Sequence, residues 1–484
     1  MQKADNAKEF VKEITPRDKD FSQWYIDVVL RAELADYSPV RGCMVIRPHG
    51  YAIWENIQKS LDERFRATGH QNAYFPLFIP ESFFQREAEH VEGFTPEVAW
   101  VTQGGSEPLT ERLAVRPTSE TIICTMYSKW IQSWRDLPVL INQWCNVVRW
   151  EKATRPFLRT AEFLWQEGHT VHASEEEAEA EALRMLDVYK EFAENVLAIP
   201  VIAGKKTERE KFAGALRTYT IEALMSDGKA LQAGTSHNLG QHFAKVFDIT
   251  YLDKDGQLKY GWQTSWGVST RLIGALIMVH GDDRGLSLPP AVAPIEVAIV
   301  PIMPGNQRER VLESASALLQ SLTQVARTVL DSREEYTPGW KFNEWEMRGV
   351  PVRVELGPRD IANNQVVLVR RDTGEKIQVG RDDVARTVRS LLDTVQRDML
   401  QKAARFRDEN TRLVSCMDEF KEILQTKRGF LLAGWCGHDQ CETSIKETTG
   451  ATVRCLPFEE MGKADKCVCC GEPAVATPVF ARAY

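Results

Sequence analysis

The stretch Val147-Val-Arg149-Trp-Glu151, followed by a short basic loop and then by Arg159-Thr-Ala-Glu-Phe163, decides the fold of the first half of the chain. Successive side chains of a strand point to opposite faces, so a strand over 139–151 would place Arg149 and Glu151 on one face above an apolar layer. A return strand over 159–165 then predicts an antiparallel hairpin. Guanidinium groups on it would suit phosphate, because their donors form a planar fork and stay charged near neutral pH. The alternative is an ordinary hairpin in which Arg149 and Glu151 merely pair, which usually adds little stability.

The size and charge of the chain limit what it can be. With 484 residues it is too long for one hydrophobic core, and usual domain sizes predict about three domains. The segment Met1–Ile14 is charged and resembles no secretory signal, and no later apolar run reaches membrane-spanning length, so we expect a cytoplasmic protein with no membrane partner. The formal net charge of −8 disfavours a broadly basic surface, so any polyanion must be bound by local patches.

Three regions differ in their patterns. Residues 1–288 predict an α+β domain on an antiparallel sheet, with strands at 72–79 (ending at Pro80), 139–151, 159–165, 216–224, 230–238 and 243–252, and a buried helix at 269–280. The proline-rich segment 289–294 is the expected linker, because proline stops a helix and interrupts sheet pairing. Alternating strands (295–302, 327–331, 351–356 and 365–371) and helices (306–325, 340–348 and 382–407) then predict a small α/β domain within 289–405. A cysteine-bearing region occupies 406–484.

Two polar segments suggest a site for a small cation. Thr118 and Glu120 lie where a strand leads into a helix, so Glu120 could bind an ammonium or iminium group with Thr118 as its partner, or both could simply cap the helix. Trp165, Glu167 and His169 have the spacing of one strand face. An aromatic wall beside a carboxylate and a histidine suits a ring-bearing cation, although core packing gives the same pattern.

Two further segments favour a phosphate-bearing ligand. The segment 230–241 is small, polar and glycine-bearing, which lets backbone approach a ligand closely, although a glycine-rich turn is the alternative. Arg271 lies in the first turn of an otherwise apolar helix, where a cation meets an unfavourable dipole and loses hydration unless an anion faces it. A nucleotide phosphate or an internal salt bridge could supply that anion.

The order of a strand ending in proline, an Arg-x-Glu hairpin and a glycine-flanked arginine helix resembles the three signature motifs of class II aminoacyl-tRNA synthetases. Four segments are similar to prolyl-tRNA synthetases of the archaeal and eukaryotic type: Arg116-Pro-Thr-Ser-Glu120, Arg149-Trp-Glu151, Phe163-Leu-Trp-Gln-Glu-Gly-His169 and the block 265–283. The resemblance covers essentially the whole chain. It implies a class II antiparallel-sheet catalytic domain, an α/β anticodon-binding domain and a small zinc-binding C-terminal domain.

The resemblance also implies roles for individual residues. Arg149 would hold the α-phosphate and the acyl oxygen, and Glu151 and Arg271 would complete the catalytic set. The implied ATP contacts are Arg149, Glu151, Arg159, Phe163, Gln232, Thr235 and Arg271. The implied proline contacts are Thr118, Glu120, Arg149, Trp165, Glu167, His169, His237 and Ser269. Magnesium would accompany ATP, and the chain would form a homodimer through a motif that contains Pro80.

The second and third regions receive roles in the same way. Glu346, Arg353, Arg359 and Asp360 match positions expected to read anticodon guanines, whereas their charges alone would indicate a solvated surface. Two cysteine pairs, Cys436-x4-Cys441 and Cys467-x2-Cys470, have zinc-ligand spacing, with Cys469 as an alternative to Cys470 and a reduced thiol cluster as the alternative to metal. The final Phe480-Ala-Arg-Ala-Tyr484 resembles the family's tyrosine-terminated tail, whose carboxylate would lie near the active site.

The implied activity is ATP-dependent activation of L-proline and its transfer to tRNA(Pro). Residues 152–264 are occupied by expected catalytic-domain elements, so we expect no editing domain in this chain. One alternative is a related synthetase for threonine, serine, glycine or histidine. The other is a catalytically inactive tRNA-binding paralogue, against which the intact Arg149, Glu151 and Arg271 argue.

Overall fold

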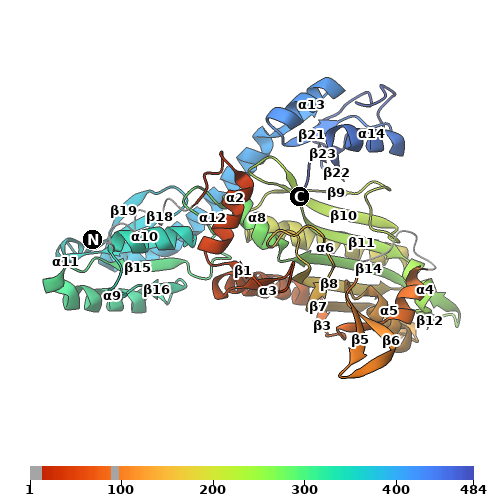
Figure 1. Cartoon of the computed structure of the whole chain (residues 1–484), viewed down its shortest axis with the longest axis horizontal. Coiled ribbons are helices and arrows are strands. Elements are labelled where there is room, and N and C mark those ends of the chain that lie inside the picture. Colours follow the sequence, from red (N-terminus) through yellow and green to blue (C-terminus); the bar gives the residue numbers. More distant parts are fainter. Residues whose placement is uncertain (1–13, 89–96) are drawn as a thin grey trace.

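The computed structural model describes residues 14–88 and 97–484 (Figure 1). The charged opening segment, on which the expectation of no secretory signal rests, falls on residues 1–13 and therefore lies outside the described residues. Within the described ranges, no helix has both the length and the apolar character needed to cross a bilayer.

An eleven-stranded sheet forms the centre of the molecule and joins strands from the first third of the chain to strands near its end. In spatial order its strands are β20 (Thr411–Val414), β21 (Phe430–Ala433), β23 (Val479–Ala481), β22 (Thr452–Pro457), β9 (Val201–Lys205), β10 (Arg217–Leu224), β11 (Ala230–Gly240), β14 (Trp262–Ser269), β8 (Glu162–His172), β7 (Val139–Val148) and β3 (Gln71–Asn72). All neighbouring pairs from β21 to β7 are antiparallel, while the outermost pairs, β20 with β21 and β3 with β7, are parallel. The antiparallel sheet predicted for the first region is confirmed.

Four helices cover one face of this sheet with their apolar sides. They are α2 (Phe21–Arg31), α3 (Pro48–Ala67), α6 (Glu175–Asn195) and α8 (Arg271–His280), and they enclose the largest core cluster together with Trp266 of β14. Helix α6 begins after Ser174, whose hydroxyl caps the helix by accepting from the Glu177 amide at 3.3 Å. The Tyr189 hydroxyl of α6 donates to Gln166 at 2.6 Å, so the even-numbered Gln166 points toward the helix. The odd-numbered neighbours Trp165 and Glu167 consequently point the other way.

Smaller elements surround the central sheet. They are β1 (Ala35–Tyr37) with β2 (Met44–Ile46), the three-stranded set β4 (Phe78–Pro80), β6 (Glu107–Val115) and β5 (Trp100–Gly104), the pair β12 (Thr250–Leu252) and β13 (Leu258–Tyr260), and the helices α4 (Glu81–Ala88), α5 (Glu120–Trp130) and α7 (His242–Phe247).

Two strand predictions were wrong in this part of the chain. The stretch 72–79 is two separate short strands, β3 and β4, rather than one continuous strand. Residues 243–252 form helix α7 followed by β12 instead of a single strand. Phe243, Ala244 and Phe247 are buried on one side of that helix, and Asp248 ends it in the left-handed conformation at φ 54°. A short apolar run is compatible with both a buried strand and a buried helix, and the spacing of these residues is that of a helix.

The second lobe is the α/β unit predicted after the proline-rich linker, at the left of Figure 1. Its sheet has the order β16 (Thr328–Leu330), β15 (Val297–Pro301), β17 (Val352–Leu356), β18 (Gln365–Arg370) and β19 (Lys376–Gly380). Strand β15 is parallel to both neighbours, while β17, β18 and β19 pair antiparallel. The helices of this lobe are α9 (Arg308–Leu322), α10 (Pro338–Met347), α11 (Pro358–Ala362) and α12 (Val384–Glu409).

The C-terminal region is built onto the central sheet. Helix α12 leads from the second lobe to this region, so the predicted boundary between 405 and 406 falls inside the helix (Figure 1). The region adds α13 (Met417–Thr426), α14 (Asp439–Thr449) and strands β20 to β23, and β22 pairs with β9. At this junction a Cβ on Gly204 would lie 2.3 Å from the Leu456 carbonyl oxygen, so the close approach of the two strands requires glycine.

Candidate active site

A cavity of about 640 Å³ opens beside strands β8, β11 and β14, within the size range of small-molecule sites. It is lined by all of the residues predicted from the first region for nucleotide and amino-acid contacts: Thr118, Glu120, Arg149, Glu151, Arg159, Phe163, Trp165, Glu167, His169, Gln232, Thr235, His237, Ser269 and Arg271. Segments more than 150 residues apart in sequence, from Thr118 to Arg271, thus meet around one volume.

The backbone around Arg149 differs from the prediction. Strand β7 ends at Val148, so Arg149 and Glu151 lie in the loop that follows it. The Trp150 amide donates to the Glu97 carbonyl at 2.8 Å, and the Trp150 side chain is 55% exposed rather than part of an apolar layer. The predicted strand over 139–151 is therefore three residues too long. After Val148 the chain no longer pairs with β8, and the Trp150 amide bonds to the Glu97 carbonyl instead.

The Arg149 guanidinium is nevertheless firmly placed. Its Nε donates to the Pro117 carbonyl at 3.0 Å, and this bond joins the loop after β7 to the segment that carries Thr118. The guanidinium carbon lies 5.5 Å from the Phe163 ring centroid and 5.4 Å from that of Trp165. The remaining N–H donors of Arg149 can therefore face the cavity, whose lining includes this residue.

One end of the cavity is acidic and buried. Glu120, Glu167 and His169 have ligand atoms within 4.8 Å of one another, and the Thr118 hydroxyl donates to Glu120. His169 Nε2 donates to Glu167 at 3.0 Å, and the Ser119 amide donates to the same carboxylate at 3.1 Å. Glycine is required at position 168, since a Cβ there would lie 2.1 Å from the Trp266 indole. Carboxylates held in this way suit a cation, either a metal ion or a protonated amine.

Burial and pairing set the charges at this end. Burial alone would raise the pKa of Glu167, but the hydrogen bonds from His169 and Ser119 outweigh it and lower that pKa to about 2. Burial alone would lower the pKa of His169, but the hydrogen bond to Glu167 raises it. Burial, together with the nearby His169, lowers the pKa of His237 to about 3, so His237 is neutral near pH 7. The acidic end therefore combines ionised carboxylate with one neutral and one readily protonated histidine.

Another part of the cavity lining is cationic. Arg149, Arg159 and Arg271 line it, and burial followed by repulsion from Arg149 and Arg159 lowers the pKa of Arg271 to about 10. Arg271 stays charged at neutral pH, and its Nε makes only a long contact of 3.4 Å with the Leu158 carbonyl. Among the described residues, no carboxylate forms an ion pair with Arg271, so the internal salt bridge considered above is not what compensates this charge. A polyphosphate would compensate all three arginines at once.

Sequence reasoning missed several lining residues. Lys206, Glu210, Lys211 and Phe212 enter the cavity from the segment between β9 and β10. The signal available was the charge run Lys205-Lys-Thr-Glu-Arg-Glu-Lys211 between two apolar strands, which carries no recognisable motif.

The last residue of the chain packs beside the loop that follows Arg149. The Tyr484 hydroxyl donates to Asp227 at 2.7 Å, and the Arg155 guanidinium lies 5.2 Å from the Tyr484 ring centroid. Arg155 also lies over Tyr25 at 4.9 Å. The terminal segment thus contacts the loop that connects β7 to β8.

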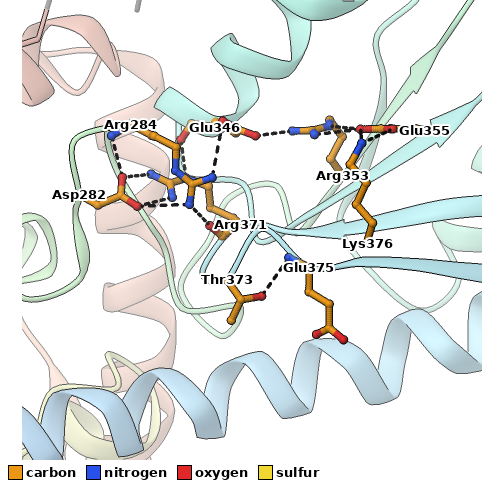
Figure 2. Close-up of polar contacts among 9 residues, drawn as sticks. All are labelled: Asp282, Arg284, Glu346, Arg353, Glu355, Arg371, Thr373, Glu375 and Lys376. Atoms are coloured by element: carbon orange, nitrogen blue, oxygen red, sulfur yellow. Dashed lines mark hydrogen bonds and ion pairs between the residues drawn. The ribbon is translucent and has the colours of Figure 1, made fainter.

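The candidate tRNA-contacting residues of the second lobe fall into two places. Glu346 and Arg353 meet at 2.8 Å, and Arg353 also donates to Glu355 at 2.9 Å, which Lys376 contacts at 3.2 Å (Figure 2). Arg359 and Asp360 instead belong to α11, where Asp360 caps the helix by accepting from the Gly357 amide at 2.8 Å. Arg353 is only 7% exposed. Sequence alone predicted exposed charges here, and the structure shows that Arg353 is an exception.

Four cysteines of the C-terminal region form a compact cluster. The sulfur atoms of Cys436, Cys441, Cys467 and Cys470 all lie within 4.8 Å of one another, with separations of 3.6 and 3.7 Å for two of the pairs. Tetrahedral zinc with Zn–S bonds of about 2.3 Å requires S···S distances of about 3.8 Å, so this donor set fits zinc. Backbone donors outweigh burial and lower the pKa of Cys467 to about 7, which favours the thiolate that a metal needs. Cys469 is not part of this cluster, which favours Cys470 over Cys469 as the fourth ligand.

Comparisons with known proteins agree with this arrangement. Residues 100–280 match the family described as tRNA synthetase class II core domain (G, H, P, S and T), residues 296–391 match the anticodon binding domain, and residues 417–484 match the prolyl-tRNA synthetase C-terminal domain. The chain is 64% identical over 482 residues to a proline–tRNA ligase of Natranaerobius thermophilus, and 61% identical over 477 residues to one of Alkaliphilus oremlandii. In both comparisons 99% of each chain is covered. The chain therefore belongs to the prolyl-tRNA synthetase family of class II aminoacyl-tRNA synthetases.

Proposed function

We propose that this protein is a proline–tRNA ligase, which activates L-proline with ATP to prolyl-adenylate and transfers the prolyl group to tRNA(Pro). The observation that carries the proposal is the polarity of the cavity, whose cationic end suits a triphosphate and whose acidic end suits an imino group. Family membership and the geometry of the site point to the same reaction.

The proposed chemistry needs no nucleophilic side chain. A carboxylate oxygen of proline attacks the α-phosphorus of ATP, the bond to the β-phosphate bridging oxygen breaks, and pyrophosphate leaves. A terminal ribose hydroxyl of the tRNA then attacks the prolyl carbonyl carbon, and AMP leaves. Positioning and charge neutralisation are the main contributions a protein makes to such transfers, with Mg²⁺ bridging phosphate oxygens.

The residues take their proposed roles from their places in the cavity. Arg149, beside Pro117 and between the two ends, would contact the α-phosphate and the acyl oxygen. Arg271 would meet the γ-phosphate at the cationic end. The remaining proposed ATP contacts are Glu151, Arg159, Phe163, Gln232 and Thr235.

The acidic end would hold the proline ring and its charged nitrogen. Glu120 and Glu167 supply negative charge, with Thr118 and His169 as hydrogen-bonding partners, and Trp165 forms an aromatic wall. His237 and Ser269 complete the proposed proline contacts. A pocket of this kind distinguishes proline from alanine weakly, because missing ring methylenes change binding by only about 1–3 kcal/mol.

The wider architecture follows the archaeal and eukaryotic type in our proposal, with domains at 1–288, 289–405 and 406–484. Zinc held by Cys436, Cys441, Cys467 and Cys470 would stabilise the third domain. Glu346, Arg353, Arg359 and Asp360 would contact the anticodon of tRNA(Pro). We also propose a cytoplasmic homodimer, with Pro80 of β4 at its interface, where Tyr74 and Phe78 nearby are 71% and 44% exposed.

Editing in cis is not part of the proposed activity. Residues 152–264 form the loop after β7, strands β8 to β13, helices α6 and α7 and part of β14, which together build the central sheet and its cover. We therefore expect the purified protein to leave alanyl-tRNA(Pro) intact. Hydrolysis of that substrate above the spontaneous rate would overturn this part of the proposal.

Amino-acid-dependent exchange of pyrophosphate into ATP tests the main proposal. We expect exchange with L-proline and much weaker exchange with threonine, serine, glycine or histidine, because only an imino acid fills the acidic end. Charging of tRNA(Pro) measured with the same protein then tests the transfer step. Exchange with one of the other amino acids but not with proline would refute the assignment.

A further inference from the structure

A buried ionic cluster beside the cavity has none of the roles assigned above. Its centre is Glu222 of β10, whose side chain is fully buried. Lys206 donates to one carboxylate oxygen at 2.8 Å, and Arg454 Nε donates to the other at 3.0 Å. Arg454 Nη2 lies 3.0 Å from that second oxygen and forms an ion pair with it. Lys206 lines the cavity, whereas Arg454 belongs to β22 and stands 232 residues after Glu222. The cluster thus joins the C-terminal region to the cavity wall.

The cluster carries more positive than negative charge. Burial would raise the pKa of Glu222, but Lys206 and Arg454 outweigh it and lower that pKa, so one ionised carboxylate faces two cations. A buried excess cation is unfavourable unless an anion compensates it. An ammonium has three N–H donors, of which Glu222 takes one, so Lys206 retains donors for a ligand in the cavity.

The neighbours of the cluster are the proposed phosphate contacts. Glu222 lies opposite Gln232 in the pairing of β10 with β11, and a register shift falls at this point of the strand. Glu222 and Arg454 are also close enough to Arg271 to alter its pKa by Coulomb interaction. The cluster therefore lies beside the cationic part of the cavity lining.

The C-terminal region is shaped to deliver Arg454 to this position. The pairing of β22 with β23 shifts register between Val453 and Cys455, and such irregularities redirect a side chain. Strand β22 reaches β9 where Leu456 lies opposite Lys205, directly before Lys206. A further hydrogen bond from Arg454 Nη1 to the Thr452 hydroxyl, at 3.0 Å, fixes the guanidinium.

We propose that Lys206 is an additional phosphate-binding residue of the ATP site, and that Arg454, acting through Glu222, is a positioning residue for it. The inference rests on the proposed adenylation reaction. Arg454 shares the negative charge of Glu222, so Lys206 is oriented without being fully neutralised. Without Arg454, Glu222 would pair with Lys206 alone and withdraw that charge from the triphosphate. The C-terminal region is thereby part of the machinery that binds ATP.

Steady-state pyrophosphate exchange with four variants tests the inference: Lys206→Met, Arg454→Met, Arg454→Lys and the double variant Lys206→Met/Arg454→Met. Loss of one charge-assisted contact predicts a KM for ATP raised roughly 10- to 100-fold in Lys206→Met, with the KM for proline nearly unchanged. Arg454→Met should raise the KM for ATP in the same way but less, and Arg454→Lys should restore most of it. The double variant should resemble Lys206→Met, because Arg454 acts through Lys206.

Thermal melting and zinc content separate this role from a structural one. The matched control is Arg412→Met, another arginine of the C-terminal region, which donates to the Arg428 carbonyl at 3.2 Å and does not contact Glu222. It should leave the KM for ATP unchanged. The inference is overturned if Arg454→Met lowers the melting temperature while the folded fraction keeps the wild-type KM for ATP, or if the two substitutions add. If wild type showed no pyrophosphate exchange with proline, the proposed function would be defeated. The role of Lys206 can still be tested in that case, by comparing the calorimetric binding of ATP to wild type and to Lys206→Met.

Discussion

Arg149 is the residue at which the two signs of charge in the cavity meet. Burial lowers its pKa, while Glu120, Glu167 and Glu151 act against that effect, and Arg149 in turn lowers the pKa of Arg271. It is therefore within Coulomb reach of both the acidic and the cationic end. A group in that position can contact the carboxylate of the amino acid and the phosphate it attacks, both of which are anions that repel each other.

Replacing Arg149 with alanine should remove the cation that lies between the proline carboxylate and the α-phosphate. We expect pyrophosphate exchange to fall by about 100- to 1,000-fold, the cost typical of losing one donor to a developing charge. Binding of tRNA(Pro), measured by filter retention, should change little, because the anticodon candidates lie in another lobe. Arg149→Lys is the matched variant, and it should recover only part of the activity because a single ammonium cannot form a planar fork.

The Glu167 and His169 pair predicts a defined pH dependence of stability. The pKa of Glu167 in the folded state, about 2, lies below its unfolded value of about 4.3, so its contribution is present above about pH 4.3 and is lost as the pH falls toward 2. The folded pKa of His169 is raised, so its contribution is present below about pH 6.5 and is lost as the pH rises through the folded value. The pair should therefore stabilise most between these two limits.

Melting temperatures of wild type and His169→Asn between pH 5 and 9 measure the effect. The difference should be largest at the acidic end of that range and shrink as the pH rises. His237→Asn is the control with the opposite sign, because a folded pKa of about 3 makes His237 increasingly destabilising as the pH falls below about 6.5. A difference for His169→Asn that grew with rising pH would contradict the charge state assigned here.

At the scale of elements, strands and helices with a regular hydrophobic period could be predicted from the sequence, but the residues at which they end could not. The α/β alternation after residue 295 predicted every strand of the second lobe to within two or three residues, apart from β19, which was not predicted. The alternation of Trp165, Glu167 and His169 correctly placed three side chains in one cavity. The loop position of Arg149 could not be predicted, because the chain after β7 is held by a distant segment, where the Glu97 carbonyl accepts from the Trp150 amide. Lys206 and Arg454 were missed for the same reason, since only tertiary contacts bring them to Glu222.

Strand β17 and helix α11 should contribute to tRNA recognition in different ways. Arg353 is buried with Glu346 and Glu355, so Arg353→Gln would leave two carboxylates under-paired and should lower both stability and tRNA use. Arg359 is exposed, so Arg359→Gln should raise the KM for tRNA without changing the melting temperature. If Arg359 reads a guanine edge, the increase should correspond to a loss of about 1–3 kcal/mol of binding free energy. Neither change should affect proline-dependent pyrophosphate exchange. Loss of exchange in both would show that the division of labour between the lobes is wrong.

At the scale of the whole molecule, the three regions are joined at several places, two of which adjoin the candidate site residues. One is the pairing of β22 with β9, and the other is an ionic network between the end of α8 and the second lobe. In that network Arg371 donates to both oxygens of Asp282, at 2.8 and 2.6 Å, and its Nε donates to the Glu346 carbonyl at 2.8 Å (Figure 2). Candidate anticodon residues are thus one contact away from an aspartate that follows the helix carrying Arg271.

Removing one partner of the Asp282 and Arg371 pair should lower the stability of the protein more than removing both partners does. The Arg371 side chain is 2% exposed, so Asp282→Asn leaves a buried guanidinium without its partner and should destabilise by about 3–5 kcal/mol. Arg371→Met should cost less, because Asp282 keeps the Arg284 amide as a donor at 2.8 Å. The double variant should be more stable than Asp282→Asn alone, as measured by thermal unfolding in a double-mutant cycle. Simple additivity of the two changes would show that the pair does not couple the lobes.

Removal of the proposed zinc ion should act first on the C-terminal region and then, through β22, on the central sheet. Structural zinc contributes folding free energy on the order of 10 kcal/mol in small modules, and the four cysteines hold together α14, β21 and the segment leading to β23. After chelation, or in Cys436→Ser, amide hydrogen exchange should accelerate in β20 to β23 and then in β9, because β9 loses its β22 partner. The five-stranded sheet of the second lobe is the internal control and should keep its protection, and Cys416→Ser, an exposed cysteine outside the cluster, is the matched variant. Faster exchange in β15 and β17 at the same zinc loss would mean that the metal stabilises the molecule as a single unit, contrary to the coupling argued from the strand order.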